Sequence, residues 1–116
     1  MNKIYHLSTC DTCRKILSLL KTDQVTLINL REENINKEDL ELMKKQMGSY
    51  EALFNKRAQK LKLMSDDEKP TKESEFKKLI LSEYTFLKRP AAIIEGNVYA
   101  GNDKTTVEKL VAILGK

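Results

Sequence analysis

Two cysteines spaced as Cys-x-x-Cys, Cys10 and Cys13, stand between an apolar strand predicted over 3–7 and an amphipathic helix predicted over about 11–21. One apolar helix face is indicated by Cys13, Ile16, Leu17 and Leu20. The residues just before, Ser8 and Thr9, are good N-cap types, so we expect Cys10 at the helix N-terminus. Unpaired N–H groups and the helix dipole stabilise a thiolate there, and the thiolate is the nucleophile. Cys10 is therefore the candidate reactive group, and Cys13, one turn along, can reach back to form a disulfide.

A Cys-x-x-Cys pair also occurs in zinc sites and as two idle thiols. A structural zinc ion normally takes four ligands, but the chain has only two cysteines and one histidine, so we expect no metal site within one chain. Free cysteine is often a small buried residue, and Cys13 on the apolar helix face fits that description. The strand-to-helix position of Cys10 favours redox or nucleophilic chemistry instead.

Composition narrows the class of protein further. The 116 residues suit one domain with a core of its own. We find no apolar run long enough for a membrane span and no export signal, and therefore expect a cytoplasmic protein with a reversible disulfide. The net charge of +4 is dispersed among acidic residues and aromatics are only 6%, which favours a mixed-charge surface over a nucleic-acid-binding one. No exposed apolar seam is apparent, so we expect a monomer.

The first half of the chain is predicted to begin with a strand, a helix and a strand. The second strand is predicted over 24–30, where β-branched and apolar residues gather. A longer helix follows, with Asn36 as its cap and Gly48 at its C-terminal end. Ser49 can start another short helix, with Arg57 one turn beyond its apolar residues.

The second half changes pattern. A helix capped by Thr71 is predicted first. Two short strands, 91–94 and 98–100, are then joined by a turn containing Gly96. The last helix is predicted to open at Asn102 or Asp103.

The whole order is βαβ, a helical insertion over about 36–87, and ββα, which predicts an α/β fold with a mixed sheet. With Cys-x-x-Cys after the first strand, this arrangement is thioredoxin-like. The chain resembles the arsenate reductase (ArsC)/Spx family over essentially its whole length, as one domain, 1–116. Three segments carry the resemblance: Ile4-Tyr5-His6-Leu7-Ser8-Thr9-Cys10, Asn55-Lys56-Arg57, and Leu87-Lys88-Arg89-Pro90-Ala91-Ala92-Ile93-Ile94.

The resemblance implies a role for each matching residue. Cys10 matches the family's nucleophile, His6 a histidine found in the reductase branch, Arg57 and Arg89 two substrate-binding arginines, and Pro90 a cis proline that faces the cysteine. Arginine suits an oxyanion because its planar, always-charged group makes bidentate contacts, and converging arginines would also favour the thiolate. The alternatives are a surface charge for Arg57 and Arg89, a polar filler for His6 and a trans bond at Pro90.

Two departures separate the chain from the branches of that family. The reductases carry a third arginine after the hairpin, which residues 99–104 lack, and this weighs against strict arsenate reduction. Cys13 matches the Spx branch, in which the cysteine pair is a redox switch in a regulator that binds RNA polymerase. The chain lacks the basic C-terminal extension of those regulators, and His6 is typical of the reductases.

Our first hypothesis is a cytoplasmic thiol-dependent oxidoreductase. Cys10 would attack a small oxyanion, a mixed disulfide with a small thiol, or a protein disulfide, and Cys13 would resolve the adduct. Glutathione with glutaredoxin, or thioredoxin, would supply the electrons, and no bound cofactor is implied. The alternative is an Spx-like redox-sensing regulator that binds RNA polymerase. Catalytic turnover distinguishes the two.

Overall fold

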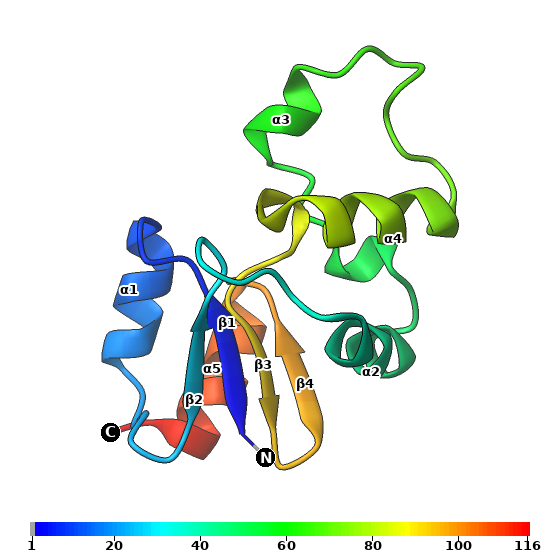
Figure 1. Cartoon of the computed structure of the whole chain (residues 1–116). Helices are drawn as coiled ribbons and strands as arrows, with labels where there is room; N and C mark the ends of the chain where they lie inside the picture. The colour runs from blue at the N-terminus through cyan, green and yellow to red at the C-terminus, as the bar shows by residue number, and fades with distance from the viewer. Residues whose placement is uncertain (1) are drawn as a thin grey trace.

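The computed structural model describes residues 2–116 and contains a four-stranded mixed sheet with helices on both faces (Figure 1). The strand order is β2-β1-β3-β4. The central strand β1 (Lys3–His6) runs parallel to β2 (Thr26–Asn29) and antiparallel to β3 (Ala91–Ile94), which forms a hairpin with β4 (Asn97–Ala100). The predicted α/β fold with a mixed sheet is confirmed, in the order βαβ, helical insertion and ββα.

The first helix, α1 (Asp11–Ser18), connects β1 to β2 and is shorter than predicted. It ends before Lys21 because the following residues pair with the C-terminal segment instead. Leu20 and Gly115 form an isolated antiparallel bridge, and the Lys21 N–H donates to the Leu114 carbonyl at 2.6 Å.

A helical insertion separates β2 from β3. It consists of α2 (Lys37–Met47), the 3-10 turn η1 (Glu51–Leu53), α3 (Gln59–Lys62), α4 (Glu73–Ser82) and the 3-10 turn η2 (Tyr84–Phe86). Asn36 caps α2 through its side chain, and Gly48 ends that helix in the left-handed region at φ 95°, both as predicted.

Two boundaries in the insertion differ from the prediction. The helix expected from Ser49 is a single 3-10 turn, because Phe54 takes up an extended conformation and pairs with Leu87 in an isolated bridge. Thr71 is not the N-cap of α4, which is Lys72. Thr71 instead donates its N–H and hydroxyl to the Glu75 carboxylate, at 2.9 and 3.2 Å.

The hairpin and the last helix form where they were predicted. Glu95 and Gly96 have φ angles of 51° and 80°, as a tight two-residue hairpin turn requires. α5 (Lys104–Leu114) begins at Asp103, whose side chain accepts the Thr106 N–H at 3.2 Å. Leu110 is the fully buried residue of α5, whereas Val111 is 37% exposed.

The hydrophobic core has two parts, one on each face of the sheet. Adjacent strand residues point to opposite faces, so Ile4 packs with Ile16, Leu20 and Leu110 of the α1 and α5 layer, whereas Tyr5 packs with the helical insertion. Figure 1 shows the same division, with α1 and α5 on one side and α2 and α4 on the other. Within residues 2–116, no helix has the length and apolar character needed to cross a membrane.

Candidate functional site

Cys10 lies at the junction between β1 and α1. It is itself the N-cap of α1, with extended φ and ψ angles of −95° and 115°. Its N–H donates to the Leu7 carbonyl at 3.0 Å and its carbonyl accepts the Arg14 N–H at 3.1 Å. Ser8, one of the two predicted caps, instead accepts a hydrogen bond from the Asn29 amide at 2.9 Å. The backbone therefore holds the Cys10 thiol, only partly buried, at the start of the helix.

The surroundings of the two cysteines shift the pKa values of their thiols in opposite directions. Burial raises the pKa of Cys10, but hydrogen bonds from the Cys13 N–H and thiol, together with the charge and a hydrogen bond of Arg89, bring that pKa below its ordinary value. Burial raises the pKa of Cys13 to about 11, and the neighbouring Cys10 adds to the rise. Both thiols are free, and Cys13 is fully buried. Cys10 is thus the more acidic, accessible thiol and Cys13 a protonated one beneath it.

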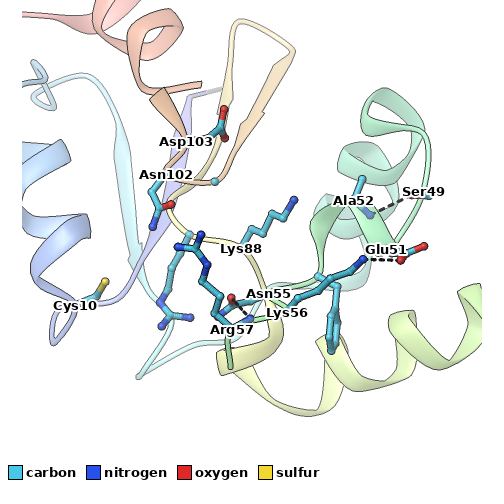
Figure 2. A pocket seen from close by; sticks show the side chains of 13 residues that line it. Cys10, Ser49, Glu51, Ala52, Asn55, Lys56, Arg57, Lys88, Asn102 and Asp103 are labelled. Atoms are coloured by element: carbon cyan, nitrogen blue, oxygen red, sulfur yellow. Dashed lines mark hydrogen bonds and ion pairs between the residues drawn. The ribbon is translucent and has the colours of Figure 1, made fainter. Parts of the chain in front are cut away.

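Cys10 opens onto a cavity of about 670 Å³ between the sheet and the helical insertion. The cavity is lined by residues from four segments of the chain: Cys10; Ser49, Glu51, Ala52, Phe54, Asn55, Lys56 and Arg57; Lys88 and Arg89; and Gly101, Asn102 and Asp103. In Figure 2, Arg57 and Lys88 lie between Cys10 on one side and η1 on the other.

Arg89 and Pro90 lie immediately before β3. Their peptide bond is cis, as predicted, and Pro90 is buried. One terminal nitrogen of Arg89, Nη1, donates to the Thr85 carbonyl at 3.4 Å, while its Nε is buried without a hydrogen-bond partner among the described residues. Arg89 also lines the cavity, and its charge and a hydrogen bond act on the Cys10 thiol.

Arg57 reaches the same cavity from a turn rather than from a helix. The turn follows the Phe54–Leu87 bridge, and the Arg57 N–H donates to Asn55 Oδ1 at 3.1 Å. The side chain of Arg57 is exposed and lines the cavity. The structure thus brings together Cys10, Arg57 and Arg89, which are far apart in the sequence.

His6 stands apart from this group. It ends β1, and its carbonyl accepts the Leu30 N–H at 2.7 Å. Burial lowers the pKa of His6, against the opposing charge of Glu32. The residues found to line the cavity do not include His6, and the main causes of the pKa shift of Cys10 are burial, Cys13 and Arg89 rather than His6.

Several lining residues were not predicted to belong to the site, notably Asn55, Lys88, Asn102 and Asp103. Asp103 is occupied as the cap of α5, and hydrogen bonding from the Thr106 hydroxyl lowers the pKa of its carboxyl. Lys56 is paired with Glu51 at 2.8 Å, whereas the described structure contains no ion pair to Lys88. The position of Lys88 next to Arg89 was the only available sequence signal. Within residues 2–116, no cluster of three or more metal-binding side chains occurs.

Solved structures with the same fold include three that match this chain almost end to end. A protein titled YffB has a TM-score of 0.81 at 18% identity, covering 99% of this chain and 100% of its own. An arsenate reductase from Vibrio cholerae has a TM-score of 0.68 at 22% identity, covering 97% of both chains. An arsenate reductase (ArsC) related protein from Brucella melitensis has a TM-score of 0.67 at 20% identity, covering 93% of this chain and 92% of its own.

These likenesses confirm the thioredoxin-like fold. Among curated proteins, none matches the chain. The ArsC family model matches residues 5–110, a span that includes both cysteines, both cavity arginines and the cis proline. The chain therefore belongs to the ArsC family.

Proposed function

We propose that this protein is a cytoplasmic thiol-dependent reductase in which Cys10 attacks the substrate and Cys13 resolves the adduct. One observation carries the proposal: an acidic, accessible Cys10 faces a cavity with two arginines and has a buried, protonated Cys13 beneath it. A nucleophile and a resolving thiol need these opposite properties, because the first must be ionised at neutral pH and the second must stay unreactive until the adduct forms.

In the first step the Cys10 thiolate attacks one sulfur of a disulfide substrate. A bond forms between Cys10 Sγ and that sulfur, the substrate S–S bond breaks, and the other sulfur leaves as a thiolate that takes a proton from water. The charge of Arg89 favours the attacking thiolate. With an oxyanion substrate, the same thiolate would displace one oxygen ligand of the central atom, and that oxygen would leave as water after taking protons from the solvent. The later attack of Cys13 on Cys10 Sγ would then pass two electrons to the central atom.

In the second step Cys13 attacks Cys10 Sγ and expels the remaining substrate thiolate, leaving a Cys10–Cys13 disulfide. The negative charge of Cys10 is one cause of the raised pKa of Cys13, and that charge disappears once Cys10 is in the adduct. Cys13 therefore becomes easier to deprotonate at the stage when it must react. The substrate has then gained two electrons and the enzyme has lost two.

Arg57 and Arg89 are proposed to bind the anionic part of the substrate. Guanidinium groups make paired hydrogen bonds to carboxylates and oxyanions. The cavity, about 670 Å³, has ample room for a small thiol disulfide as well as for a small oxyanion. A dithiol donor, glutaredoxin with glutathione or thioredoxin, would reduce the Cys10–Cys13 disulfide, and the protein would act as a monomer.

A coupled NADPH-consumption assay tests this proposal. Purified protein is supplied with either arsenate or a small-thiol disulfide, and with either the glutathione–glutaredoxin or the thioredoxin system. We expect turnover with at least one combination, lost in Cys10→Ser and strongly reduced in Cys13→Ser. Arg57→Ala and Arg89→Ala should raise KM for the anionic substrate, whereas Arg31→Ala, an exposed arginine outside the cavity, should not.

Absence of turnover with every donor would overturn the reductase proposal. If Cys10 and Cys13 still formed a disulfide under mild oxidant, the redox-switch alternative would then be favoured.

A further inference from the structure

We infer that Asn55 is a positioning residue that holds Arg57 and Arg89 together as one anion-binding unit. The inference rests on the proposed function, because it concerns the arginines assigned there to the substrate. It adds a residue that takes no part in the sulfur chemistry and acts through the two arginines.

The hydrogen bonds of Asn55 connect the two arginine segments. Its Oδ1 accepts the Arg57 N–H at 3.1 Å, which fixes the turn that carries Arg57. Its Nδ2 donates to the Thr85 carbonyl at 3.1 Å. The same carbonyl accepts Arg89 Nη1 at 3.4 Å. One amide side chain and one carbonyl therefore link the backbone of the first arginine to the guanidinium of the second.

The main chain extends this link into a short two-stranded clasp. The Asn55 N–H donates to the Phe86 carbonyl at 2.7 Å, and the Lys88 N–H donates to the Leu53 carbonyl at 2.8 Å. Phe54 and Leu87 form the bridge between those two bonds. The clasp sets the spacing of the two segments, and the side chain of Asn55 fixes the positions of Arg57 and Arg89 at the end of the clasp that faces the cavity.

The side chain of Asn55 lines the cavity and makes two hydrogen bonds, one to the Thr85 carbonyl and one from the Arg57 N–H. Without its amide, the Thr85 carbonyl would keep only the long bond from Arg89, and the Arg57 turn would lose its side-chain acceptor. Both arginines would then sample more orientations, and the cavity would attract anions less strongly.

The matched control is Asn34. It is also half-buried, donates Nδ2 to backbone carbonyls at the end of α4 (Ile80 at 3.0 Å and Leu81 at 3.2 Å), and accepts a nearby N–H. It does not line the cavity. Asn34→Ala therefore removes comparable hydrogen bonds from the insertion without altering the arginines.

The test compares the alkylation of Cys10 by anionic iodoacetate and by neutral iodoacetamide, in the Cys13→Ser background so that Cys10 is the only thiol. The ratio of the two rates reports the attraction of anions to the site, because a change in exposure of Cys10 affects both reagents alike. We expect Asn55→Ala to lower the ratio by about threefold or more, since a positive cleft can raise anion encounter rates by roughly 10- to 1,000-fold.

Asn55→Ser guards against a simple folding defect. A serine hydroxyl can still accept the Arg57 N–H but is too short to reach the Thr85 carbonyl, so this variant should fold and still show a lowered ratio. An unchanged ratio in Asn55→Ala and Asn55→Ser, with a lowered ratio in Arg57→Ala and Arg89→Ala, would overturn the positioning role alone. An equal fall in Asn34→Ala would also overturn it, because general loosening of the insertion would then explain the effect. Unchanged ratios in both arginine variants would instead contradict the anion site of the proposed function.

Discussion

Arg89 and Cys10 lie near opposite ends of the chain, yet the charge and a hydrogen bond of Arg89 lower the pKa of the Cys10 thiol. This contact exists because β3, which begins just after Arg89, pairs with β1, which ends just before Cys10. Burial of Cys10 acts in the opposite direction, so Arg89 and the hydrogen bonds from Cys13 decide the sign of the shift.

Replacing Arg89 by methionine should therefore make Cys10 less reactive at neutral pH. Loss of the cation raises the pKa of Cys10, and each unit of rise lowers the thiolate fraction about tenfold at pH values below the pKa. The iodoacetamide rate, measured from pH 5 to 10 in the Cys13→Ser background, should have a midpoint at higher pH in Arg89→Met. Arg31→Met should leave the midpoint unchanged. Coincident profiles for Arg89→Met and its parent would contradict the assigned contact.

Residues 99–104 lack the third arginine of the reductases, but Lys88 brings a further cation to the cavity. It lines the cavity and makes no ion pair within 4.0 Å in the described structure, although its charge also helps to lower the pKa of Asp103 in the same cavity. Lys88→Gln should raise KM for an anionic substrate by about two- to fivefold at unchanged kcat, as expected for a solvent-screened charge. Lys56→Gln should have a smaller effect, because Lys56 is already paired with Glu51. Equal effects of the two variants would assign no special role to Lys88.

His6 was predicted to tune Cys10, and that role stays a prediction. Because burial, Cys13 and Arg89 are the main causes of the pKa shift of Cys10, we expect His6→Asn to leave the iodoacetamide rate profile unchanged. The same measurement on Arg89→Met supplies the positive control. A shifted midpoint in His6→Asn would restore the role suggested by the sequence.

Local patterns were sufficient to predict most of the fold. The Asn36 cap, Gly48 at the end of α2 and the turn around Gly96 each depend on residues close in sequence, and all three were predicted. The end of α1 and the Phe54–Leu87 bridge were missed, because each depends on pairing with a distant segment.

In the candidate site, too, features set by neighbouring residues could be predicted and features set by distant segments could not. The position of Cys10 at the start of α1 follows from a strand-to-helix pattern of a few residues. Asn55 and Lys88 belong to the cavity only because residues 53–57 lie beside residues 86–89, and no periodicity within either segment indicates that contact.

Tyr5 links the central strand to α2, and its loss should reduce stability. Its ring is fully buried and its hydroxyl donates to Asp39, which also pairs with Lys3 at 2.8 Å. Tyr5→Phe leaves that carboxylate short of a donor, and we expect the free energy of unfolding to fall by about 1–3 kcal/mol in urea titrations. Tyr99→Phe is the control, because no hydrogen bond of the Tyr99 hydroxyl is found in residues 2–116 and its effect should stay within about 0.5 kcal/mol. Equal stabilities for the two variants would contradict the structural role of the Tyr5 hydroxyl.

Cys13 should make the protein less stable at alkaline pH. Burial raises the pKa of its thiol to about 11, whereas an unfolded cysteine ionises near 8.5. A group whose pKa is raised by folding stabilises the fold fully below its unfolded pKa and loses that contribution as pH rises toward its folded pKa. Stability should therefore fall between about pH 8.5 and pH 11.

Urea denaturation under reducing conditions at pH 7.5 and 10.5 checks this expectation. The fall in the free energy of unfolding between these two pH values should be smaller in Cys13→Ala than in wild type. Cys10→Ser is the matched comparison and should reduce the fall less than Cys13→Ala does, because burial, the largest cause of the raised pKa of Cys13, remains in that variant. Burial and the bond to Asp39 also raise the pKa of Tyr5, so some alkaline loss should remain in every variant. An equal fall in wild type and Cys13→Ala would mean that Cys13 is not held protonated in the folded protein, and its assignment as a resolving thiol kept inactive until the adduct forms would lose its basis.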